Sequence, residues 1–164
     1  MNILVAGGAG FIGSHTCVSL TEAGHTVVVA DDLSNSKADA IDRIAKITGT
    51  RPKFYECDVA DAASVEKIFA ENSLDGVIHF AGFKAVGESV EKPLMYYRNN
   101  LGSTVTLADA CLRHGVKRFV FSSSATVYGD NKPPFVEGME LMPTTNPYGE
   151  TKVISERILT DTAK

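Results

Sequence analysis

Short apolar runs rich in valine, isoleucine and phenylalanine alternate along the chain with longer segments of mixed polarity. Several of the short runs are apolar at consecutive positions, which is typical of strands buried on both faces of a parallel sheet. We therefore predict strands at residues 3–6, 26–30, 53–56, 76–80 and 118–121.

The segments between these runs have the length or the spacing of helices, at residues 11–23, 37–48, 61–72 and 93–114. In the third of them, Val65, Ile68 and Phe69 fall on one helical face, as in an amphipathic helix. A last helix is predicted to begin at Asn146, which can cap it, with Pro147 in the first helical position.

Strands that alternate with helices are joined by right-handed βαβ crossovers. The pattern therefore predicts an α/β fold with a doubly wound parallel sheet of the Rossmann type. Residues 129–147 contain four of the six prolines and are predicted to be a loop. Because a dinucleotide-binding sheet of this type has about six strands, five predicted strands suggest a fold truncated before its last strands.

Glycines follow the first predicted strand at Gly7, Gly8, Gly10 and Gly13 and satisfy both GxGxxG and GxxGxxG. Glycine permits the tight turn, the close approach of a pyrophosphate to the backbone, and the packing of a helix on a strand. The helix that follows offers free N–H groups and a partial positive charge to phosphate. Since the motif stands between a strand and a helix of one βαβ unit, it predicts a dinucleotide-binding turn.

Asp31 ends the second predicted strand, roughly 20 residues beyond the glycines. A carboxylate there can accept hydrogen bonds from both ribose hydroxyls of an adenosine and would repel a 2′-phosphate. No arginine or lysine stands at residues 32–36, and Lys37 is the nearest cation. The sequence therefore favours NAD over NADP.

Asp58 and Val59 follow the third predicted strand and admit two interpretations. Asp58 could reach the edge of an adenine ring, with Val59 packed on the ring. Alternatively, Asp58 could cap the helix predicted from residue 61. The residues alone do not separate these alternatives.

Tyr148 and Lys152 form a YxxxK motif in the last predicted helix. Residues four apart lie on one helical face, so the ammonium is near the phenol, favours the phenolate, and makes Tyr148 a candidate general base. The spacing alone is common by chance. The run Ser122, Ser123 and Ser124 strengthens the prediction of a catalytic site, because these residues directly follow the fifth predicted strand. Ligands of open α/β sheets bind outside the carboxyl ends of the strands.

Together these motifs resemble the extended short-chain dehydrogenase/reductases, and among them the UDP-glucose (UDP-galactose) 4-epimerases. The resemblance extends over essentially the whole chain. Its most distinctive stretches are GGAGFIGSHT (7–16), DLSNSK (32–37), HFAGFKAVGESV (79–90), YYRNN (96–100), FSSSATVYG (121–129) and NPYGETK (146–152). Ala6 departs from the threonine that is more usual before the glycines.

The resemblance implies Tyr148 as the base, Lys152 as its electrostatic partner and nicotinamide-ribose ligand, and Ser124 as the residue that bridges to the sugar O4. It also implies that the backbone of Phe11 and Ile12 contacts the pyrophosphate. The remaining residues implied to bind the cofactor are Gly7, Gly10, Gly13, Asp31, Asn35, Ser36, Asp58, Val59, Phe80, Ala81, Gly82, Lys84, Asn99 and Ser122.

We accordingly expect NAD-dependent epimerisation at C4 of a UDP-hexose through a 4-keto intermediate. Residues 1–164 would form one incomplete NAD-binding Rossmann domain without the small C-terminal substrate domain, and by themselves show little activity. Two alternatives stay open: another NAD-dependent sugar-nucleotide enzyme, such as a 4,6-dehydratase or decarboxylase, and a non-catalytic NAD-binding module. An acidic pair beside the strand-end serine would favour a dehydratase, and Ala125-Thr126 stands there instead. A binding module would usually lose the tyrosine or the lysine.

Composition and charge narrow the partners further. The chain is 44% hydrophobic and 22% charged with a net charge of −4, which argues against nucleic acid and anionic membranes. Three widely spaced cysteines and four histidines show no metal-ligand spacing, so no metal is expected. The chain shows no apolar span and no leader sequence, so we expect a cytoplasmic protein. A homodimer is expected to form through the helices at residues 93–114 and 147–162.

Overall fold

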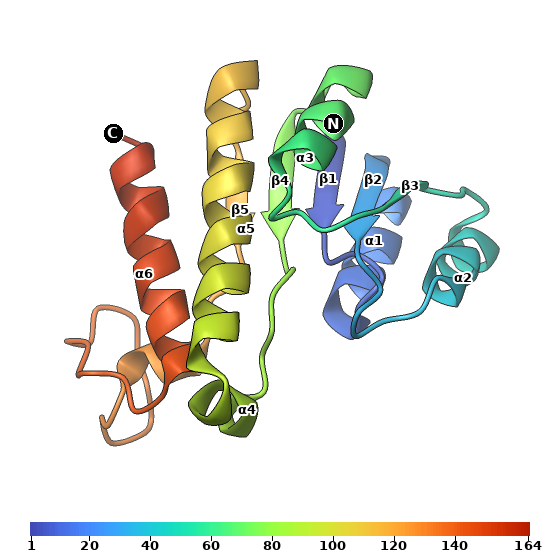
Figure 1. The fold of residues 1–164 in the computed structure, drawn as a ribbon. Helices are drawn as coiled ribbons and strands as arrows, with labels where there is room; N and C mark the ends of the chain where they lie inside the picture. The colour runs from blue at the N-terminus through green and yellow to red at the C-terminus, as the bar shows by residue number, and fades with distance from the viewer. The chain divides into compact units, whose positions relative to one another are not determined.

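The computed structural model describes all 164 residues and contains one parallel sheet with the strand order β3-β2-β1-β4-β5 (Figure 1). The strands are β1 (Asn2–Ala6), β2 (Thr26–Asp31), β3 (Lys53–Glu56), β4 (Gly76–His79) and β5 (Phe119–Phe121). The helices are α1 (Phe11–Glu22), α2 (Asp39–Thr48), α3 (Ala62–Glu71), α4 (Val86–Glu91), α5 (Pro93–His114), the 3₁₀ helix η1 (Ala125–Tyr128) and α6 (Pro147–Thr162). A sheet that grows in both directions from β1 is doubly wound, so the predicted fold class is confirmed.

The chain divides into two compact units, which are described separately. The first unit comprises Met1–Ala81 and Thr106–Ser122 and contains the whole sheet. The second unit comprises Gly82–Val105 and Ser123–Lys164.

In the first unit, each face of the sheet carries its own apolar core. One face packs against α3 and the end of α5, with the core residues Leu4, Ala6, Val28, Ala30, Val59, Val65, Ile68, Phe69, Val77, Leu107, Ala110 and Cys111. The other face packs against α1 and α2, with Ile3, Val5, Ala9, Cys17, Val27, Val29, Ile41 and Ile44. Successive residues of β1 and β2 alternate between the two cores, which is why these strands are apolar at consecutive positions.

The predicted strands and the long helices are confirmed to within one or two residues at most ends. Two short elements, α4 and η1, were not predicted. Helices of six and four residues are too short to show a periodicity or to form by propensity alone. None of the helices combines the length with the apolar character that crossing a membrane requires.

In the second unit, α4 is held against α5 by a buried tyrosine. The Tyr96 side chain is fully buried; its hydroxyl donates to Glu88 Oε2 at 3.0 Å and accepts from the Ala85 N–H at 3.1 Å. Burial, together with the hydrogen bond to Glu88, raises the pKa of this phenol. Tyr96 therefore donates its proton and anchors the N-terminal end of α4.

Small polar side chains form the buried contact between α5 and α6 in the second unit. Asn100 Nδ2 donates to Thr151 Oγ1 at 3.1 Å, and the hydroxyls of Thr104 and Ser155 are hydrogen-bonded at 3.1 Å. These four residues are at most 3% exposed. Each buried hydroxyl or amide has a partner, so the contact carries little desolvation penalty.

The start of α6 follows the sequence prediction. Asn146 has extended backbone angles, its Oδ1 accepts from the Gly149 N–H at 2.8 Å, and Pro147 occupies the first helical position. This cap fixes where α6 begins after the proline-rich loop, and so fixes the position of Tyr148 in its first turn.

Replacing Asn146 with alanine removes the cap oxygen and should lower the free energy of unfolding by about 1 kcal/mol. Denaturant unfolding measures the change. Asn146→Asp retains an acceptor oxygen and serves as the matched control, with stability close to that of the parent protein. Equal stability of the alanine variant and the parent would show that the cap contributes nothing.

Candidate functional site

The glycine turn between β1 and α1 depends on two glycines for different reasons. Gly7 has a φ of +79°, and a Cβ there would lie 2.6 Å from the Ala81 nitrogen. A Cβ on Gly13 would overlap the Gly7 carbonyl oxygen. Gly7 thus allows the left-handed backbone of the turn and the close approach of the backbone of residues 80–81. Gly13 allows α1 to pack on the turn.

The first turn of α1 leaves N–H groups open to a ligand. The cap residue Gly10 provides no side-chain hydrogen bond, and the first turn contains no acidic residue. The Ser14 N–H donates to the Gly10 carbonyl at 2.9 Å, so the helical bonding begins only there. Phe11 and Ile12 are 77% and 56% exposed. A Cβ on Gly10 would meet only the Gly7 oxygen, at 3.3 Å, so this side of the turn is open for a pyrophosphate.

Asp31 at the end of β2 is 8% exposed and bonded to the same turn. Its Oδ2 accepts from the Ala9 N–H at 2.9 Å, and its Oδ1 accepts from the Leu33 N–H at 3.0 Å and the Ser36 hydroxyl at 2.7 Å. Because a carboxylate oxygen has about two acceptor sites, Oδ2 retains one for a ribose hydroxyl. Ser36 thus contacts Asp31, while Asn35 lies exposed beside it.

The structure removes one of the two interpretations of Asp58. The cap of α3 is Asp61, whose Oδ2 accepts from the Ser64 N–H at 2.9 Å. Asp58 instead accepts from the Ala60 N–H at 2.8 Å and is otherwise exposed. The capping alternative for Asp58 is therefore wrong, and its role at adenine stays a prediction. Val59 packs in the core of the first unit.

The residues after β4 fall in both units. In the first, the N–H groups of Phe80 and Ala81 both donate to the Ala6 carbonyl, at 2.8 and 3.0 Å. In the second, Asn100 Oδ1 accepts from the Phe83 N–H at 2.9 Å and its Nδ2 donates to the Phe83 carbonyl at 3.0 Å. This amide fixes the backbone between Gly82 and Lys84.

The family resemblance implied that Asn99 binds the cofactor, and it implied no role for its neighbour Asn100. Asn99 Nδ2 donates to Asn100 Oδ1 at 3.1 Å, and Asn100 is 3% exposed. The only signal in the sequence is the pair of adjacent asparagines within a helical segment, which does not show which of them faces the interior.

Tyr148 and Lys152 lie on one face of α6, as the spacing predicted. Lys152 Nζ is 5.8 Å from the centre of the Tyr148 ring. Lys152 is 7% exposed, and this burial lowers the pKa of its ammonium to about 8. Tyr148 is half-buried. Little water therefore surrounds the Lys152 ammonium beside the Tyr148 ring.

The Tyr148 backbone is held by Ser89, which sequence reasoning missed. Ser89 on α4 is fully buried; its Oγ accepts from the Tyr148 N–H at 3.2 Å and donates to the Val86 carbonyl at 2.6 Å. Because α4 was not predicted, no signal could place this serine beside α6.

The three strand-end serines are in different environments. The Ser122 N–H donates to the His79 carbonyl at 3.1 Å and extends the pairing of β5 with β4. Ser123 departs from the expectation of an open hydroxyl, because its Oγ is inaccessible and has no hydrogen-bond partner. Ser124 is the cap of η1, with its Oγ bonded to Thr126.

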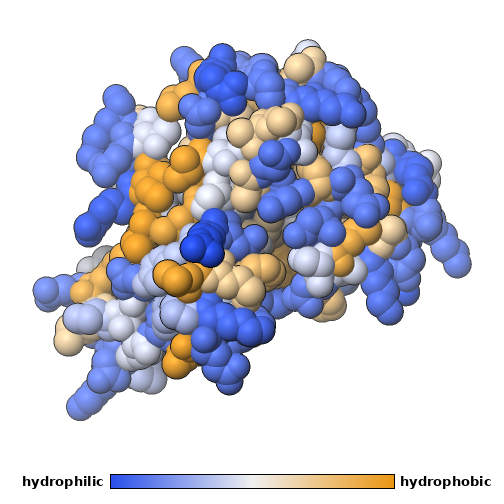
Figure 2. Space-filling view, viewed as in Figure 1, coloured by the Kyte–Doolittle hydropathy of each residue, from blue (hydrophilic) through white to orange (hydrophobic).

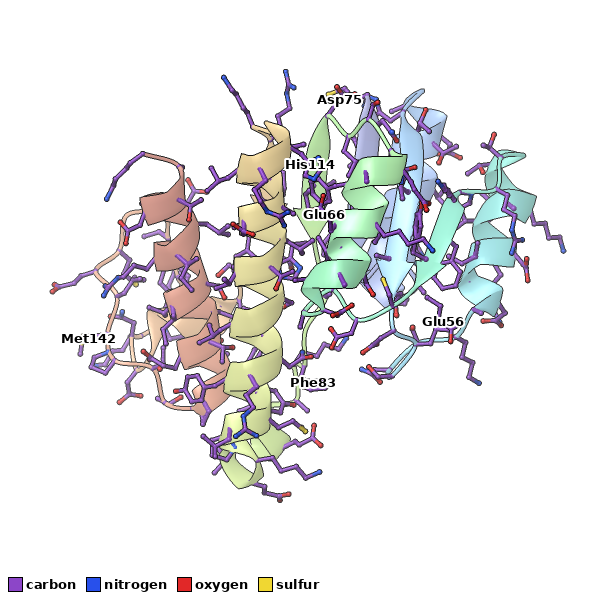
Figure 3. The ribbon with its side chains drawn as sticks, turned by 45° about the horizontal axis from the view of Figure 1, so that its top comes forward. Glu56, Glu66, Asp75, Phe83, His114 and Met142 are labelled. Carbon is purple, nitrogen blue, oxygen red and sulfur yellow. The ribbon has the colours of Figure 1, made fainter.

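The histidines do not form a site. His114 and Glu66 point toward each other (Figure 3), with Nε2 and Oε1 2.9 Å apart. The hydrogen bonds from His114 and Arg113 lower the pKa of the Glu66 carboxyl. This contact joins α3 to the end of α5. No cluster of three or more histidine, cysteine, aspartate or glutamate side chains could hold a metal ion.

The sheet order, the glycine turn and the Tyr148–Lys152 pair define a Rossmann-like protein with a tyrosine–lysine site. Residues 3–164 match the model of the NAD dependent epimerase/dehydratase family, and the chain belongs to that family.

Curated relatives support the same assignment. The chain is 56% identical to the UDP-glucose 4-epimerases of Haemophilus influenzae and Bacillus subtilis, over 100% and 98% of its length and 49% and 48% of theirs. Among solved structures, the UDP-glucose 4-epimerase of Bifidobacterium longum in complex with NAD⁺ and UDP matches with a TM-score of 0.96 and 50% identity, over 98% of this chain and 48% of that one. The resemblance stated from the sequence is confirmed. The chain spans about half the length of the curated relatives it matches.

Alanine at the two glycines should separate folding from ligand binding. Gly13→Ala forces a Cβ into a backbone carbonyl and should destabilise the protein by about 3 kcal/mol or more. Gly10→Ala should unfold like the parent and yet bind NAD at least about tenfold more weakly, since its methyl group enters the phosphate side of the turn. Thermal unfolding and calorimetric titration measure the two effects. Equal NAD affinity of Gly10→Ala and the parent would contradict this role of the turn.

Burial of Lys152 should make its removal stabilising at neutral pH. The ordinary pKa of 10.5 is lowered to about 8 in the folded state, so the unfolded chain binds more protons between these values and stability rises with pH there. Below pH 8 the full cost of the buried charge is present. Lys152→Met should therefore raise the free energy of unfolding by about 1–3 kcal/mol at pH 7, and this gain should shrink toward pH 10.

Denaturant unfolding at several pH values tests this prediction. Lys67→Met, at an exposed lysine on α3, is the matched control and should show no such pH dependence. A gain for Lys152→Met that stays constant from pH 7 to 10 would contradict the depressed pKa.

Proposed function

We propose that the chain provides the NAD-binding and proton-transfer part of an enzyme that epimerises a UDP-hexose, UDP-glucose or UDP-galactose, at C4. The observation that carries the proposal is the buried cation of Lys152 at 5.8 Å from the Tyr148 ring centre, in a chain of the NAD dependent epimerase/dehydratase family. Its relatives are UDP-glucose 4-epimerases, and solved ones hold NAD or UDP.

The residues present suit NAD. The open N–H groups of Phe11 and Ile12 and the clear side of Gly10 would take the pyrophosphate, and the free acceptor site of Asp31 would take an adenosine ribose hydroxyl. Asp58 and Val59 would lie at adenine. Further along the cofactor would lie Asn35, Ser36, Phe80, Ala81, Gly82, Lys84, Asn99, Ser122, Ser124, Tyr148 and Lys152.

Tyr148 would serve as the base and then as the acid. As the phenolate, its Oη takes the proton of the sugar 4-hydroxyl when C4 is oxidised, and it returns the proton to O4 when C4 is reduced, so no proton is consumed overall. Bound NAD would supply the hydride acceptor for the first step and the hydride donor for the second. Lys152, protonated below pH 8, stabilises the phenolate.

The domain arrangement and the assembly are part of the proposal. Residues 1–164 would be an incomplete NAD-binding domain, with the uridine diphosphate held by a substrate domain outside them. Exposed apolar side chains on α5, Leu94, Val105 and Leu112 at 50–65%, support a homodimer through this helix. Figure 2 shows such apolar residues among polar ones on the face that carries α5. The predicted location is the cytoplasm.

Tyr148→Phe tests the function directly. Removing the hydroxyl leaves no group to take the sugar proton, so turnover of UDP-galactose by the full-length protein should fall by at least about 100-fold. A coupled assay for UDP-glucose measures it. Tyr55→Phe, at a phenol bonded to Glu71 on α3, is the control and should keep parental turnover. Near-parental activity of Tyr148→Phe would overturn the proposed function.

A further inference from the structure

Ser124 accepts two hydrogen bonds from a single neighbour. Its Oγ lies 3.2 Å from the Thr126 nitrogen and 2.9 Å from Thr126 Oγ1, and Thr126 is the donor in both bonds. A serine hydroxyl has one proton to donate and two lone pairs with which to accept. Thr126 therefore occupies both acceptor positions of Ser124.

The consequence is that the polarity of Ser124 is fixed. With both lone pairs engaged, the hydroxyl has only its own O–H left for any other partner. A hydroxyl that can only donate stabilises an oxygen that gains negative charge, and it cannot take a proton from a substrate.

We propose that Thr126 is a positioning residue that makes Ser124 an obligate hydrogen-bond donor to the reacting sugar oxygen; this inference rests on the proposed function. Ser124 then supports the oxygen as it loses its proton to Tyr148 and becomes a carbonyl, while Tyr148 alone transfers the proton. The assignment goes beyond the YxxxK pair, because it gives a direction to the serine hydrogen bond and names the group that sets it.

Thr126 also contacts α6, and any test must separate this packing from the hydrogen bond. A Cβ on Gly149 would lie 3.2 Å from the Cβ, carbonyl oxygen and Oγ1 of Thr126, so the helix passes closely over this side chain beside Tyr148. Valine has nearly the same shape as threonine and lacks the hydroxyl, while serine keeps the hydroxyl and lacks the methyl group. The two variants therefore divide the two roles.

The experiment is a double-mutant cycle in the full-length protein. Thr126→Val should lower kcat about tenfold and change KM for the UDP-sugar by less than about twofold. Without the Thr126 hydroxyl, the Ser124 O–H is no longer held as a donor, and this matters most in the transition state, where the sugar oxygen gains negative charge. Thr126→Ser should restore kcat to within about threefold of the parent. In a Ser124→Ala background, Thr126→Val should have no further effect, because Thr126 acts through Ser124.

A second readout needs neither cofactor nor turnover. Hydrogen exchange of the Thr126 amide should accelerate in Ser124→Ala, which removes its acceptor, and stay slow in Thr126→Val, which keeps the backbone donor. Equal exchange in Ser124→Ala and the parent would show that this hydrogen bond is absent, and would overturn the proposal.

The kinetic outcomes also decide the matter. Parental kcat in Thr126→Val, or the same loss in the presence and absence of the Ser124 hydroxyl, would overturn the positioning role; the second result would assign the effect to packing on Gly149. Failure of the proposed function is separate, because it would appear as a parent protein without epimerase activity or as an active Tyr148→Phe variant.

Discussion

The hydrogen bonds at the carboxyl end of β1 join three strands of the first unit, and the shape of the glycine turn depends on them. The Ala6 carbonyl accepts the N–H groups of Phe80 and Ala81, and the Gly7 N–H donates to the Ala30 carbonyl at 2.8 Å. The ends of β2 and β4 are thereby tied to one turn. This arrangement is possible only because Gly7 has no side chain, since a Cβ would collide with the backbone of Ala81. The geometry offered to a pyrophosphate is thus set by backbone packing, before any ligand binds.

Asp31 shows how a residue that we propose binds a ligand can also serve the fold. Its bonds to Ala9, Leu33 and Ser36 hold the glycine turn against the end of β2. A carboxylate engaged in this way is already oriented and mostly desolvated, so binding a ribose hydroxyl would require little rearrangement. Lys152 illustrates the opposite case, because its burial lowers the pKa of the ammonium and destabilises the folded protein at neutral pH. Under the proposed function, such a charge is retained for its effect on Tyr148.

In the second unit, small polar side chains hold the candidate site residues and the backbone near them in place. Ser89 holds the Tyr148 backbone, Asn100 holds the backbone on either side of Phe83, and Thr126 holds Ser124. These residues were not singled out from the sequence, whereas Tyr148, Lys152 and Ser124 were. A motif reveals residues that share a local spacing. Thr126 lies only two residues from Ser124, but Ser89 and Asn100 belong to other elements than the backbone they hold. Those two contacts join residues 59 and 17 positions apart along the chain, which no local pattern encodes.

The sequence by itself determined the five strands, the long helices, the cap of α6 and the glycine turn, because each depends on periodicity or on the conformational needs of single residues. It also determined the family, whose motifs extend over the whole chain. Only the tertiary structure decided that Asp61 rather than Asp58 caps α3, that Ser123 is enclosed, and that α4 exists. The position of α4 depends on residues brought together from distant parts of the chain, since Ser89 meets Tyr148, 59 residues later. The cap of α3 depends instead on which of two nearby carboxylates reaches the Ser64 N–H, and neither outcome follows from a periodic pattern of residue types.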